Sequence, residues 1–507
     1  MIRILTTKQI KALDAYTIQH EPIPSIELME RACRAFVSWF VQRIDATKKA
    51  GIVCGTGNNG GDGLGIARLL SDWGYMVTVW IVRGPVPESE DFKMNLERLK
   101  KINADSSKPK LQIIDIHSDP DKELFKYIDV IIDAIFGSGL SRQVEGIYAR
   151  TIQLINEADV PRIAIDMPSG LSADQPSSGD IIRAHYTVSF QLPKLAFFLP
   201  QSYPFTGEWI TVDIGLNRDF IREAGSTNYL VTQKDARKIL RKRLKFDHKG
   251  VYGHALMIAG SFGKMGAALL ASRAALRSGV GLLSVHIPKC GYEILQTALP
   301  EAMVNVDTHD NFFTDFPHLE NFNVIGIGPG LGQHPETVTA LAELMRNFKK
   351  PMVIDADALN ILGANQELLK LIPENSVLTP HPKEFERIVG KWVNDFERLE
   401  KQKALASRLR CVVILKGAYT SIATAEGKIF FNPTGNPGMA KGGSGDVLTG
   451  ILTGLLAQRY SAEQTAILGV YLHGFSGDLG AREKGEYGMI ASDLVEFLPQ
   501  SFKWVTN

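Results

Sequence analysis

The sequence is poor in cysteine, and its few cysteines are spaced too widely to form a framework. The 507 residues include only four, at positions 33, 54, 290 and 411, and no two of them form a CxxC pair. This spacing argues against a zinc cage or a disulfide scaffold and is typical of a reducing compartment. We therefore expect a cytoplasmic protein.

A strong net charge and long apolar runs are also lacking. The formal net charge is +1, so no broad field would recruit nucleic acid or an anionic membrane. No uncharged apolar stretch reaches the ~18 residues that a membrane span needs. The opening residues, MIRILTTKQIKALD, carry charge too early for a secretory signal. The expected partners are small molecules, with neither nucleic acid nor a membrane among them.

Short apolar runs alternate with helical patterns in two successive series. Two opening helices, at 6–20 and 25–44, precede the first series, whose strand candidates are 51–54, 76–82, 130–135 and 162–165. The second series has strand candidates at 255–259, 282–287, 324–327, 352–354, 377–378 and 412–415. Such alternation predicts parallel sheets covered by helices, so both halves are expected to be three-layer α/β/α domains. The polar, aperiodic stretch 217–229 divides them, into residues 1–224 and 225–507.

The strongest motif of the first half is GTGNNGGDG at residues 55–63, between a strand and a helix. Such a Rossmann-like turn brings backbone N–H groups and a helix N-terminus close to phosphate. It lacks the lysine of a phosphoryl-transferring P-loop. Glycine richness alone is common in tight turns, whereas the asparagine and aspartate side chains add groups that face a ligand.

Two later strand ends carry acidic and small residues, around Asp133 and Asp166. Ligands of open α/β sheets lie outside the carboxyl ends of the strands, so the three turns are predicted to meet over one pocket. Asn59, Asp133 and Ser169 offer only oxygen ligands, which suit a hard cation. The alternative is that Asp133 and Asp166 cap the helices that follow.

On these motifs, the segment from the opening helices to about residue 215 resembles the NAD(P)H-hydrate epimerase family. The resemblance implies a potassium ion held by Asn59, Asp133 and Ser169. Asp166 is our candidate acid/base, since a positioned carboxylate can assist interconversion at C6. The resemblance also implies contacts with the hydrated cofactor by Asp166 and by Asn58, Asn59, Gly60, Gly61, Asp62, Gly137, Ser138, Gly139, Leu140, Ser141, Arg142 and Gln143.

The second half contains NPGMAKGGSGDVL at residues 436–448, a glycine-rich turn that leads into an apolar helix. Its amides would hold the charge that develops on a phosphoryl group. Asp446 would take a proton from the attacking hydroxyl. The alternative is that Asp446 only caps the helix.

This arrangement resembles the ribokinase-like fold, and residues 252–493 are similar to ADP- or ATP-dependent NAD(P)H-hydrate dehydratases. The matching segments include AGS at 259–261, GPGLG at 328–332, DADALN at 355–360, TPHPKEF at 379–385 and KGAYT at 416–420. One position departs from the pattern, since Lys441 stands where threonine is more common.

The resemblance implies a role for each segment. Contacts with the hydrated cofactor are expected from Ala267, Gly330, His381 and Asp446. Adenine-nucleotide contacts are expected from Lys416, Gly417, Ala418, Tyr419, Thr420, Asn436, Gly438, Met439, Ala440, Lys441, Gly442, Gly443, Ser444 and Gly445. Magnesium would bridge the phosphates. His381 could equally cap the next helix, and Asp355 and Asp357 could be magnesium ligands or turn residues.

The sequence therefore predicts a bifunctional enzyme that epimerises NAD(P)H hydrate and dehydrates the S form, at the expense of ADP or, alternatively, ATP. A competing interpretation is a ribokinase-type small-molecule kinase with a regulatory front domain. A third makes the front domain a binding module without catalysis. We also expect a homo-oligomer.

Overall fold

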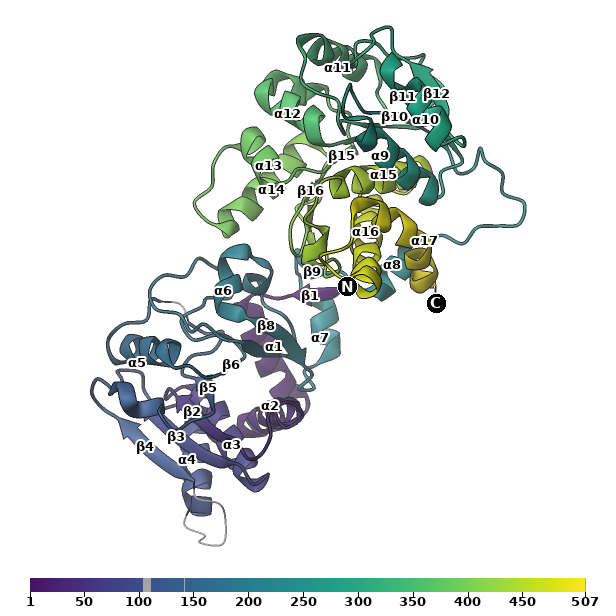
Figure 1. Ribbon diagram of the computed structural model, residues 1–507. Coiled ribbons are helices and arrows are strands. Elements are labelled where there is room, and N and C mark those ends of the chain that lie inside the picture. The colour runs from purple at the N-terminus through teal and green to yellow at the C-terminus, as the bar shows by residue number, and fades with distance from the viewer. Residues whose placement is uncertain (104–110, 141, 507) are drawn as a thin grey trace. The chain divides into compact units, whose positions relative to one another are not determined.

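The computed structural model describes residues 1–103, 111–140 and 142–506 (Figure 1). These residues form two compact units. The front unit is Arg3–Ser226 with Asn394–Phe396, and the rear unit is Met1–Ile2, Thr227–Val393 and Glu397–Asn507.

The front unit has one seven-stranded sheet in the order β4-β3-β2-β5-β6-β7-β8, and all of its pairs are parallel. Its strands are β2 (Lys49–Cys54), β3 (Met76–Val82), β4 (Gln112–Ile116), β5 (Val130–Ala134), β6 (Arg162–Ile165), β7 (Tyr186–Phe190) and β8 (Glu208–Val212). The central strand β5 is buried along its whole length, as expected where helices cover both faces of a parallel sheet.

Helices cover both faces of this sheet. Successive residues of β2 point to opposite sides: Ile52 packs into the cluster that contains α2 and α3, and Val53 into the cluster with Tyr148 and Ile152 of α5. Figure 1 shows α2 and α3 on one side of the sheet and α5 on the other. The helical segments are α1 (Thr7–His20), α2 (Ser25–Phe40), α3 (Asn58–Asp72), α4 (Glu90–Asn103), α5 (Gly146–Glu157), α6 (Tyr203–Thr206), α7 (Arg218–Glu223), η1 (Lys122–Phe125), η2 (Leu195–Phe198) and η3 (Pro200–Ser202).

The rear unit is built on an eleven-stranded sheet in the order β1-β9-β18-β17-β16-β15-β14-β13-β10-β11-β12. Pairing is parallel from β12 to β16, whereas β17 runs antiparallel to both of its neighbours. The strands are β1 (Ile2–Ile4), β9 (Asn228–Leu230), β10 (His254–Ile258), β11 (Leu282–Ile287), β12 (Met303–Val306), β13 (Val324–Ile327), β14 (Met352–Ile354), β15 (Val377–Leu378), β16 (Val412–Leu415), β17 (Ser421–Ala423) and β18 (Ile429–Phe431).

The rear core is closed by tightly packed helices. A Cβ atom added to Gly450 of α15 would lie 2.0 Å from the Ala271 carbonyl oxygen of α9, so the two backbones touch. The helical segments are α8 (Gln233–Ile239), α9 (Met265–Arg277), α10 (Tyr292–Ala298), α11 (Pro335–Asn347), α12 (Ala356–Ala364), α13 (Pro382–Val389), α14 (Asp395–Leu409), α15 (Ser444–Ala457), α16 (Ala462–Lys484), α17 (Ala491–Thr506), η4 (Lys289–Gly291), η5 (Gln366–Leu371) and η6 (Pro437–Met439).

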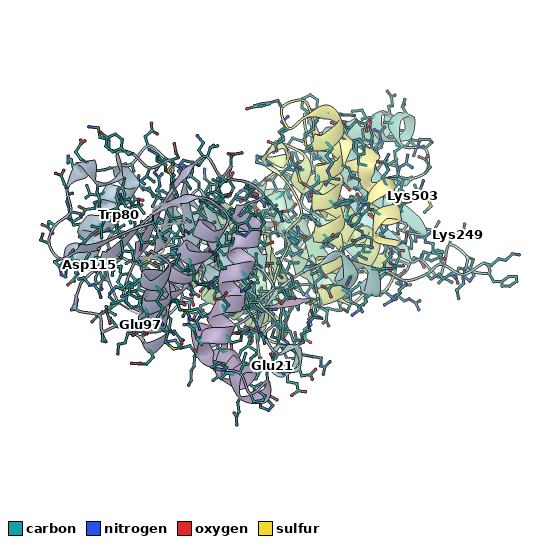
Figure 2. The ribbon with its side chains drawn as sticks, turned by 90° about the horizontal axis from the view of Figure 1, so that it is seen from below. Glu21, Trp80, Glu97, Asp115, Lys249 and Lys503 are labelled. Carbon is teal, nitrogen blue, oxygen red and sulfur yellow. The ribbon has the colours of Figure 1, made fainter. Side chains whose placement is uncertain are left out.

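Both units confirm the predicted three-layer α/β architecture. Trp80 of β3 is 3% exposed and belongs to the core, whereas Lys249, labelled with it in Figure 2, lies on the connection between α8 and β10. Chain order reverses between β2 and β5 in the front sheet and between β10 and β13 in the rear sheet. Ligands of such sheets bind at these reversal points. Among the described residues, no helix is long and apolar enough to cross a membrane.

Candidate functional site

The front unit has a cavity of about 730 Å³ at the carboxyl ends of β2 and β5, where chain order reverses. The structure brings together here most of the predicted contact residues: Asn58, Asn59, Asp62, Gly137, Ser138, Gly139, Leu140, Arg142, Gln143 and Asp166. Ser141 lies outside the described residues. The three turns singled out in the sequence thus meet at one pocket.

Two of the predicted contact residues are buried glycines that do not line the pocket. Gly60 and Gly61 are buried in the first turn of α3 and do not line the cavity. A Cβ atom on Gly60 would lie 1.8 Å from the Gly55 carbonyl oxygen. The absence of a side chain lets the start of α3 pack tightly against the residue that follows β2, and Asn58 and Asn59 of the same turn line the cavity.

Asp166 has a strained backbone conformation, and its side chain is bonded to a buried lysine. Its φ of 61° is uncommon for a non-glycine residue, and such strain is concentrated at functional sites. Asp166 Oδ1 accepts hydrogen bonds from the Lys194 ammonium, from the Ser189 hydroxyl at 3.2 Å and from the Phe190 amide at 3.2 Å. Burial alone would raise its pKa, but the charge and hydrogen bond of Lys194, followed by the Phe190 amide, hold the pKa of Asp166 below its usual range.

Helix capping does not account for either front aspartate. The next α-helix after Asp133 begins only at Gly146, and no helical segment follows Asp166 before η2. Asp133 instead fastens two loops: its Oδ1 accepts from the Ser169 hydroxyl at 2.6 Å, and its Oδ2 accepts from the Ser169 amide at 2.7 Å.

The residues around Asp133 fit a bound monovalent cation. The Asp133 carboxyl is fully buried and forms no ion pair with a described residue, and burial raises its pKa to about 6. The groups around it offer oxygen atoms as ligands: the Ser169 hydroxyl, and the Phe136 carbonyl oxygen that lies 3.1 Å from that hydroxyl. The Asn59 side-chain oxygen, which could also ligate a cation, lies 3.1 Å from the position of a Cβ atom added to Gly137. An uncompensated carboxylate among oxygen groups is the chemistry that a hard cation satisfies.

Sequence reasoning missed several residues that line this pocket, among them the charged side chains of Lys11, Asp14 and Lys194. Lys194 follows a strand with no flanking motif, so nothing in the sequence pointed to it. Lys11 and Asp14 lie three residues apart on α1, and helical spacing alone would have placed them on one face.

The rear unit has an open pocket of about 490 Å³ beside its own reversal point. It brings together four predicted residues or loops: Ala267 of α9, Gly330 after β13, the glycines Gly442 and Gly443, and Asp446. Lys264 and Asp357 line it as well. The predicted anion-binding turn and the predicted cofactor contacts therefore share one site.

Asp446 lies in the first turn of α15 without capping it. The N-cap residue is Gly443, whose φ of 93° suits glycine, and no side chain caps this helix. Burial and then the negative charge of Asp355 raise the pKa of Asp446 to about 6. Such a carboxyl is well matched to proton transfer near neutral pH.

A buried ion network joins the two predicted nucleotide loops. Asp355 accepts from the Lys416 ammonium at 2.7 Å and from the Thr449 hydroxyl at 2.7 Å. Lys416 also pairs with Glu384 at 3.9 Å, and a Cβ on Gly445 would be 3.4 Å from its Nζ. Both Asp355 oxygens are thus used internally. Of the two aspartates, Asp357 lines the pocket, and its Oδ2 accepts from the Gly332 amide at 2.8 Å.

Two predicted contact side chains are engaged within the protein. His381 Nδ1 accepts from the backbone amides of Lys383 and Glu384, so the helix-capping alternative describes its local role. Lys441 donates to the carbonyl oxygens of Tyr487 at 2.7 Å and Met489 at 2.5 Å. The atypical lysine therefore fastens the turn to the 487–489 segment.

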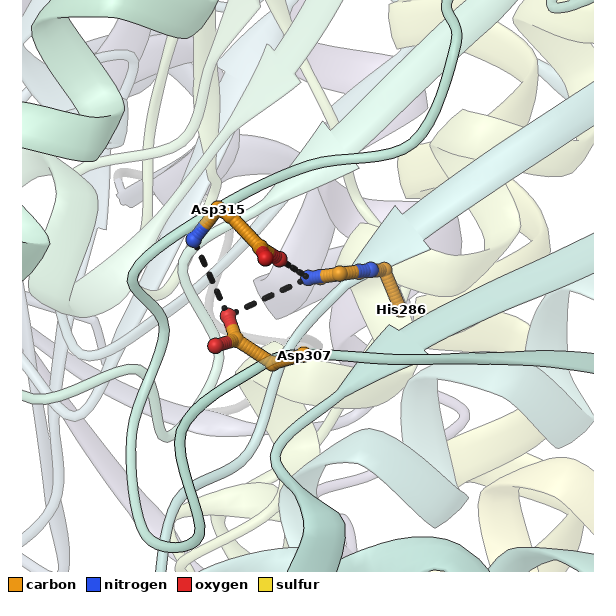
Figure 3. Close-up of side chains that lie close together, drawn as sticks. All are labelled: His286, Asp307 and Asp315. Carbon is orange, nitrogen blue, oxygen red and sulfur yellow. Dashed lines mark hydrogen bonds and ion pairs between the residues drawn. The ribbon is translucent and has the colours of Figure 1, made fainter.

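A further cluster, His286, Asp307 and Asp315, has the composition of a metal site (Figure 3). His286 Nε2 lies 3.3 Å from Asp307 Oδ2 and 3.6 Å from Asp315 Oδ1. Asp307 already accepts hydrogen bonds from the amides of His309, Thr314 and Asp315 and from the Thr314 hydroxyl. These bonds saturate the carboxylate, so the cluster fastens the loop between Asp307 and Asp315.

Comparisons with known proteins match both halves. A sequence model described as "NAD(P)H-hydrate dehydratase" matches residues 255–500, and one described as "YjeF-related protein N-terminus" matches residues 25–196. The bifunctional NAD(P)H-hydrate repair enzyme Nnr of Moorella thermoacetica is 38% identical over 98% of this chain and 96% of its own length.

Solved structures resemble the rear half. A ribokinase-like superfamily protein of Enterococcus faecalis is 27% identical, with a TM-score of 0.50 that covers 56% of this chain and 98% of that one. An ADP/ATP-dependent NAD(P)H-hydrate dehydratase of Bacillus subtilis, co-crystallised with ATP and Mg²⁺, is 35% identical over 55% of this chain and 98% of its own, with a TM-score of 0.49.

The fold and the two pockets define an enzyme with a Rossmann-like front unit and a ribokinase-like rear unit. With a full-length relative at this level of identity, the chain belongs to the family of bifunctional NAD(P)H-hydrate repair enzymes. The family and fold predicted from the sequence are confirmed.

Proposed function

We propose that this enzyme restores damaged nicotinamide nucleotides in two steps. Residues 1–224 interconvert the R and S epimers of NAD(P)H hydrate, and residues 225–507 dehydrate the S epimer at the expense of ADP, with ATP as a possible donor. The observation that supports this most is the pair of pockets at the sheet reversal points, each with a buried carboxyl group whose pKa is shifted. Because one chain carries both activities, either epimer of the hydrate can be converted back to NAD(P)H.

In the front pocket, the α3 N-terminus and the 137–143 loop would hold the hydrated cofactor, and Asp166 would move a proton at the C6 carbinolamine. Asp166 is suited to accept a proton because Lys194 keeps it ionised. Asn59, Asp133 and Ser169 would hold potassium, whose charge would offset the buried Asp133 carboxylate and fix the two loops.

In the rear pocket, Asp446 would take the proton of the C6 hydroxyl as that oxygen attacks the terminal phosphorus of the nucleotide. Backbone amides of the glycine turn would hold the charge on the phosphoryl oxygens. The C6–O bond then breaks, phosphate leaves with the electron pair, and the N1 lone pair forms C6=N1. Loss of a C5 proton restores the dihydronicotinamide.

Nucleotide binding would come from the 416–420 and 436–445 segments, which adjoin at Lys416 and Gly445. Asp357 and Asp446 are the carboxylates that face this pocket, and magnesium bound near them would neutralise phosphate charge. Ala267 and Gly330 would contact the hydrated cofactor on the other side of Asp446, with His381 at the neighbouring helix start.

We further propose that the protein is a cytoplasmic homo-oligomer. Free and mostly buried cysteines suit a reducing compartment. Light scattering coupled to size-exclusion chromatography measures the mass in solution, and a mass of one chain at all concentrations would contradict the oligomer.

The function is tested by the recovery of NADH absorbance from a mixture of both epimers, with ADP, with ATP and with neither. Complete recovery that requires a nucleotide is expected, with ADP the faster donor. Recovery without any nucleotide, or formation of a stable phosphorylated product, would contradict the dehydratase assignment.

A further inference from the structure

The first helix of the front unit forms one wall of the front pocket. Ile10, Lys11 and Asp14 of α1 line the cavity together with Asp166 and Lys194. The matched sequence model begins at residue 25, after the end of this helix. The pocket therefore contains a carboxyl and an ammonium group from a helix that precedes the residues matched by that model.

Hydrogen bonds fix α1 against the other pocket walls. The Thr7 amide donates to Asp174 Oδ2 at 2.6 Å, and the Thr7 hydroxyl donates to the Ser138 carbonyl oxygen at 3.3 Å. Lys11, one helical turn after Thr7, lies beside Gly139, because a Cβ atom added to Gly139 would be 3.7 Å from Lys11 Nζ. Because these contacts join α1 to the predicted cofactor loop, the side chains of α1 have a defined place beside the cofactor.

The Asp14 carboxyl faces charged groups, and no described residue donates a hydrogen bond to it. The charges that act on it are those of Asp166 and Lys194, and it acts in turn on Asp62. Lys11 lines the same wall. Burial and then the Asp166 charge raise the pKa of Asp14 to about 6, while the pKa of Asp166 is lowered. Two carboxyls whose pKa values are pushed apart in this way suit an acid and a base.

We propose that Asp14 is a proton donor to the C6 hydroxyl and works with Asp166 as the base, an inference that rests on the proposed epimerase function. Asp14 gives its proton to the hydroxyl, the C6–O bond breaks, and water leaves while the N1 lone pair forms C6=N1. Water then adds to the other face of C6, the C6=N1 electrons return to N1, and Asp166 takes the released proton. Transfer of that proton from Asp166 to Asp14 through the pocket completes the cycle.

Asp62 is a second pocket carboxyl whose pKa is raised, and it suits this role less well. Burial, followed by the charges of Asp166 and Asp14, raises the pKa of Asp62 well above its usual range. A donor must lose and regain its proton in each turnover, which is most efficient when its pKa lies near the working pH. Asp14 meets that condition, whereas Asp62 would remain protonated and serve as a hydrogen-bond donor to the cofactor.

The test measures epimerisation of each separated epimer by chromatography, with the full chain, without nucleotide, and against an enzyme-free control. Asp14→Asn is compared with Asp62→Asn, and Glu97→Gln, an exposed side chain on α4 (Figure 2), is the matched control. Circular dichroism and a melting curve establish that each variant is folded. Asp14→Glu keeps the carboxyl and is the second test if Asp14→Asn does not fold.

For Asp14→Asn we expect kcat to fall by about 10² to 10⁴, with KM within about threefold of the parent protein. In the parent protein, kcat should fall tenfold per pH unit above about 6, because Asp14 must be protonated. This decline of kcat above about pH 6 should be absent in Asp14→Asn. It should remain in Asp14→Glu, whose kcat should lie between those of Asp14→Asn and the parent protein. An unchanged kcat, or an unchanged decline of kcat with pH, in folded Asp14→Asn would overturn the inference. If the parent protein itself fails to epimerise, the proposed front function fails instead.

Discussion

The Lys194 ammonium is buried against Asp166 Oδ1, and it also donates to the Ser189 hydroxyl at 2.7 Å. Asp166 is 9% exposed and Lys194 only 1%, so both partners of this ion pair are largely removed from bulk solvent. Such a pair keeps a carboxylate ionised inside a pocket, and removal of either member leaves an uncompensated buried charge.

Replacement of Lys194 by methionine tests this relationship. Epimerisation should fall by at least about 100-fold, because the pKa of Asp166 would rise once the ammonium is gone. The free energy of unfolding should fall by about 3 kcal/mol, as measured by urea denaturation. Lys122→Met, at an exposed position on η1, is the matched control. Full epimerase activity in Lys194→Met would contradict the account.

Asp446 gives the dehydratase a defined pH dependence. Its pKa of about 6 means that the base is ionised only above that pH, so kcat should rise tenfold per pH unit below about 6 and level off above it. Asp446→Asn should lower kcat by about 10² to 10⁴ at pH 7.5.

The same residue has a predictable effect on stability. Because the folded-state pKa of Asp446 is raised, its contribution is fully present below about pH 4 and is lost as pH rises through about 6. Asp446→Asn should therefore melt at the same or a higher temperature than the parent protein at pH 7.5. A lower melting temperature at that pH would show that the carboxylate supports the fold.

Asp355→Asn should weaken the rear site through Lys416. In this variant a neutral amide replaces the carboxylate. Lys416 therefore loses its closest ion pair, in which Lys416 Nζ and Asp355 Oδ1 are 2.7 Å apart. We expect KM for the nucleotide to rise about tenfold and the free energy of unfolding to fall by about 2–3 kcal/mol. Asp357→Asn, at a pocket-lining carboxyl, should instead lower kcat at little cost in stability. Identical behaviour of the two variants would contradict the different roles assigned to them.

Potassium should stabilise the front unit through Asp133. Replacement of N-methylglucamine chloride by potassium chloride at constant ionic strength should raise the melting temperature by about 2–4 °C. The effect should be larger at pH 8 than at pH 5.5, since the cation-free pKa of Asp133 is about 6 and potassium requires the carboxylate. Asp133→Asn should abolish it. An equal rise in that variant would contradict a potassium site at Asp133.

Periodicity and strand-end chemistry predicted much of this molecule, because both are local properties. The strand predicted at 76–82 is observed as β3, and the helix predicted at 25–44 is observed as α2 (Ser25–Phe40). Asp133 and Asp166 were found because they end strands. Lys194 was not, because it follows a strand by four residues and meets Asp166 only after β6 and β7 pair.

Other features depend on packing that no local pattern records. The different roles of Asp355 and Asp357 could not be predicted, because the role of Asp355 depends on its bonds with Lys416 and Thr449. These residues lie 61 and 94 positions away in the sequence. The capping geometry of His381 and the anchoring of Lys441 to two carbonyls also appear only in three dimensions.

The central claim, that two separate sites act in turn on one substrate, is tested most directly with single-site variants on an equal mixture of the two epimers. With ADP, the parent protein should convert all of the hydrate to NADH. Asp166→Asn should stop when the S epimer is consumed and leave R, whereas Asp446→Asn should form no NADH yet still equilibrate the epimers. Complete conversion by Asp166→Asn at the parent rate, or loss of both activities in either variant, would contradict the account.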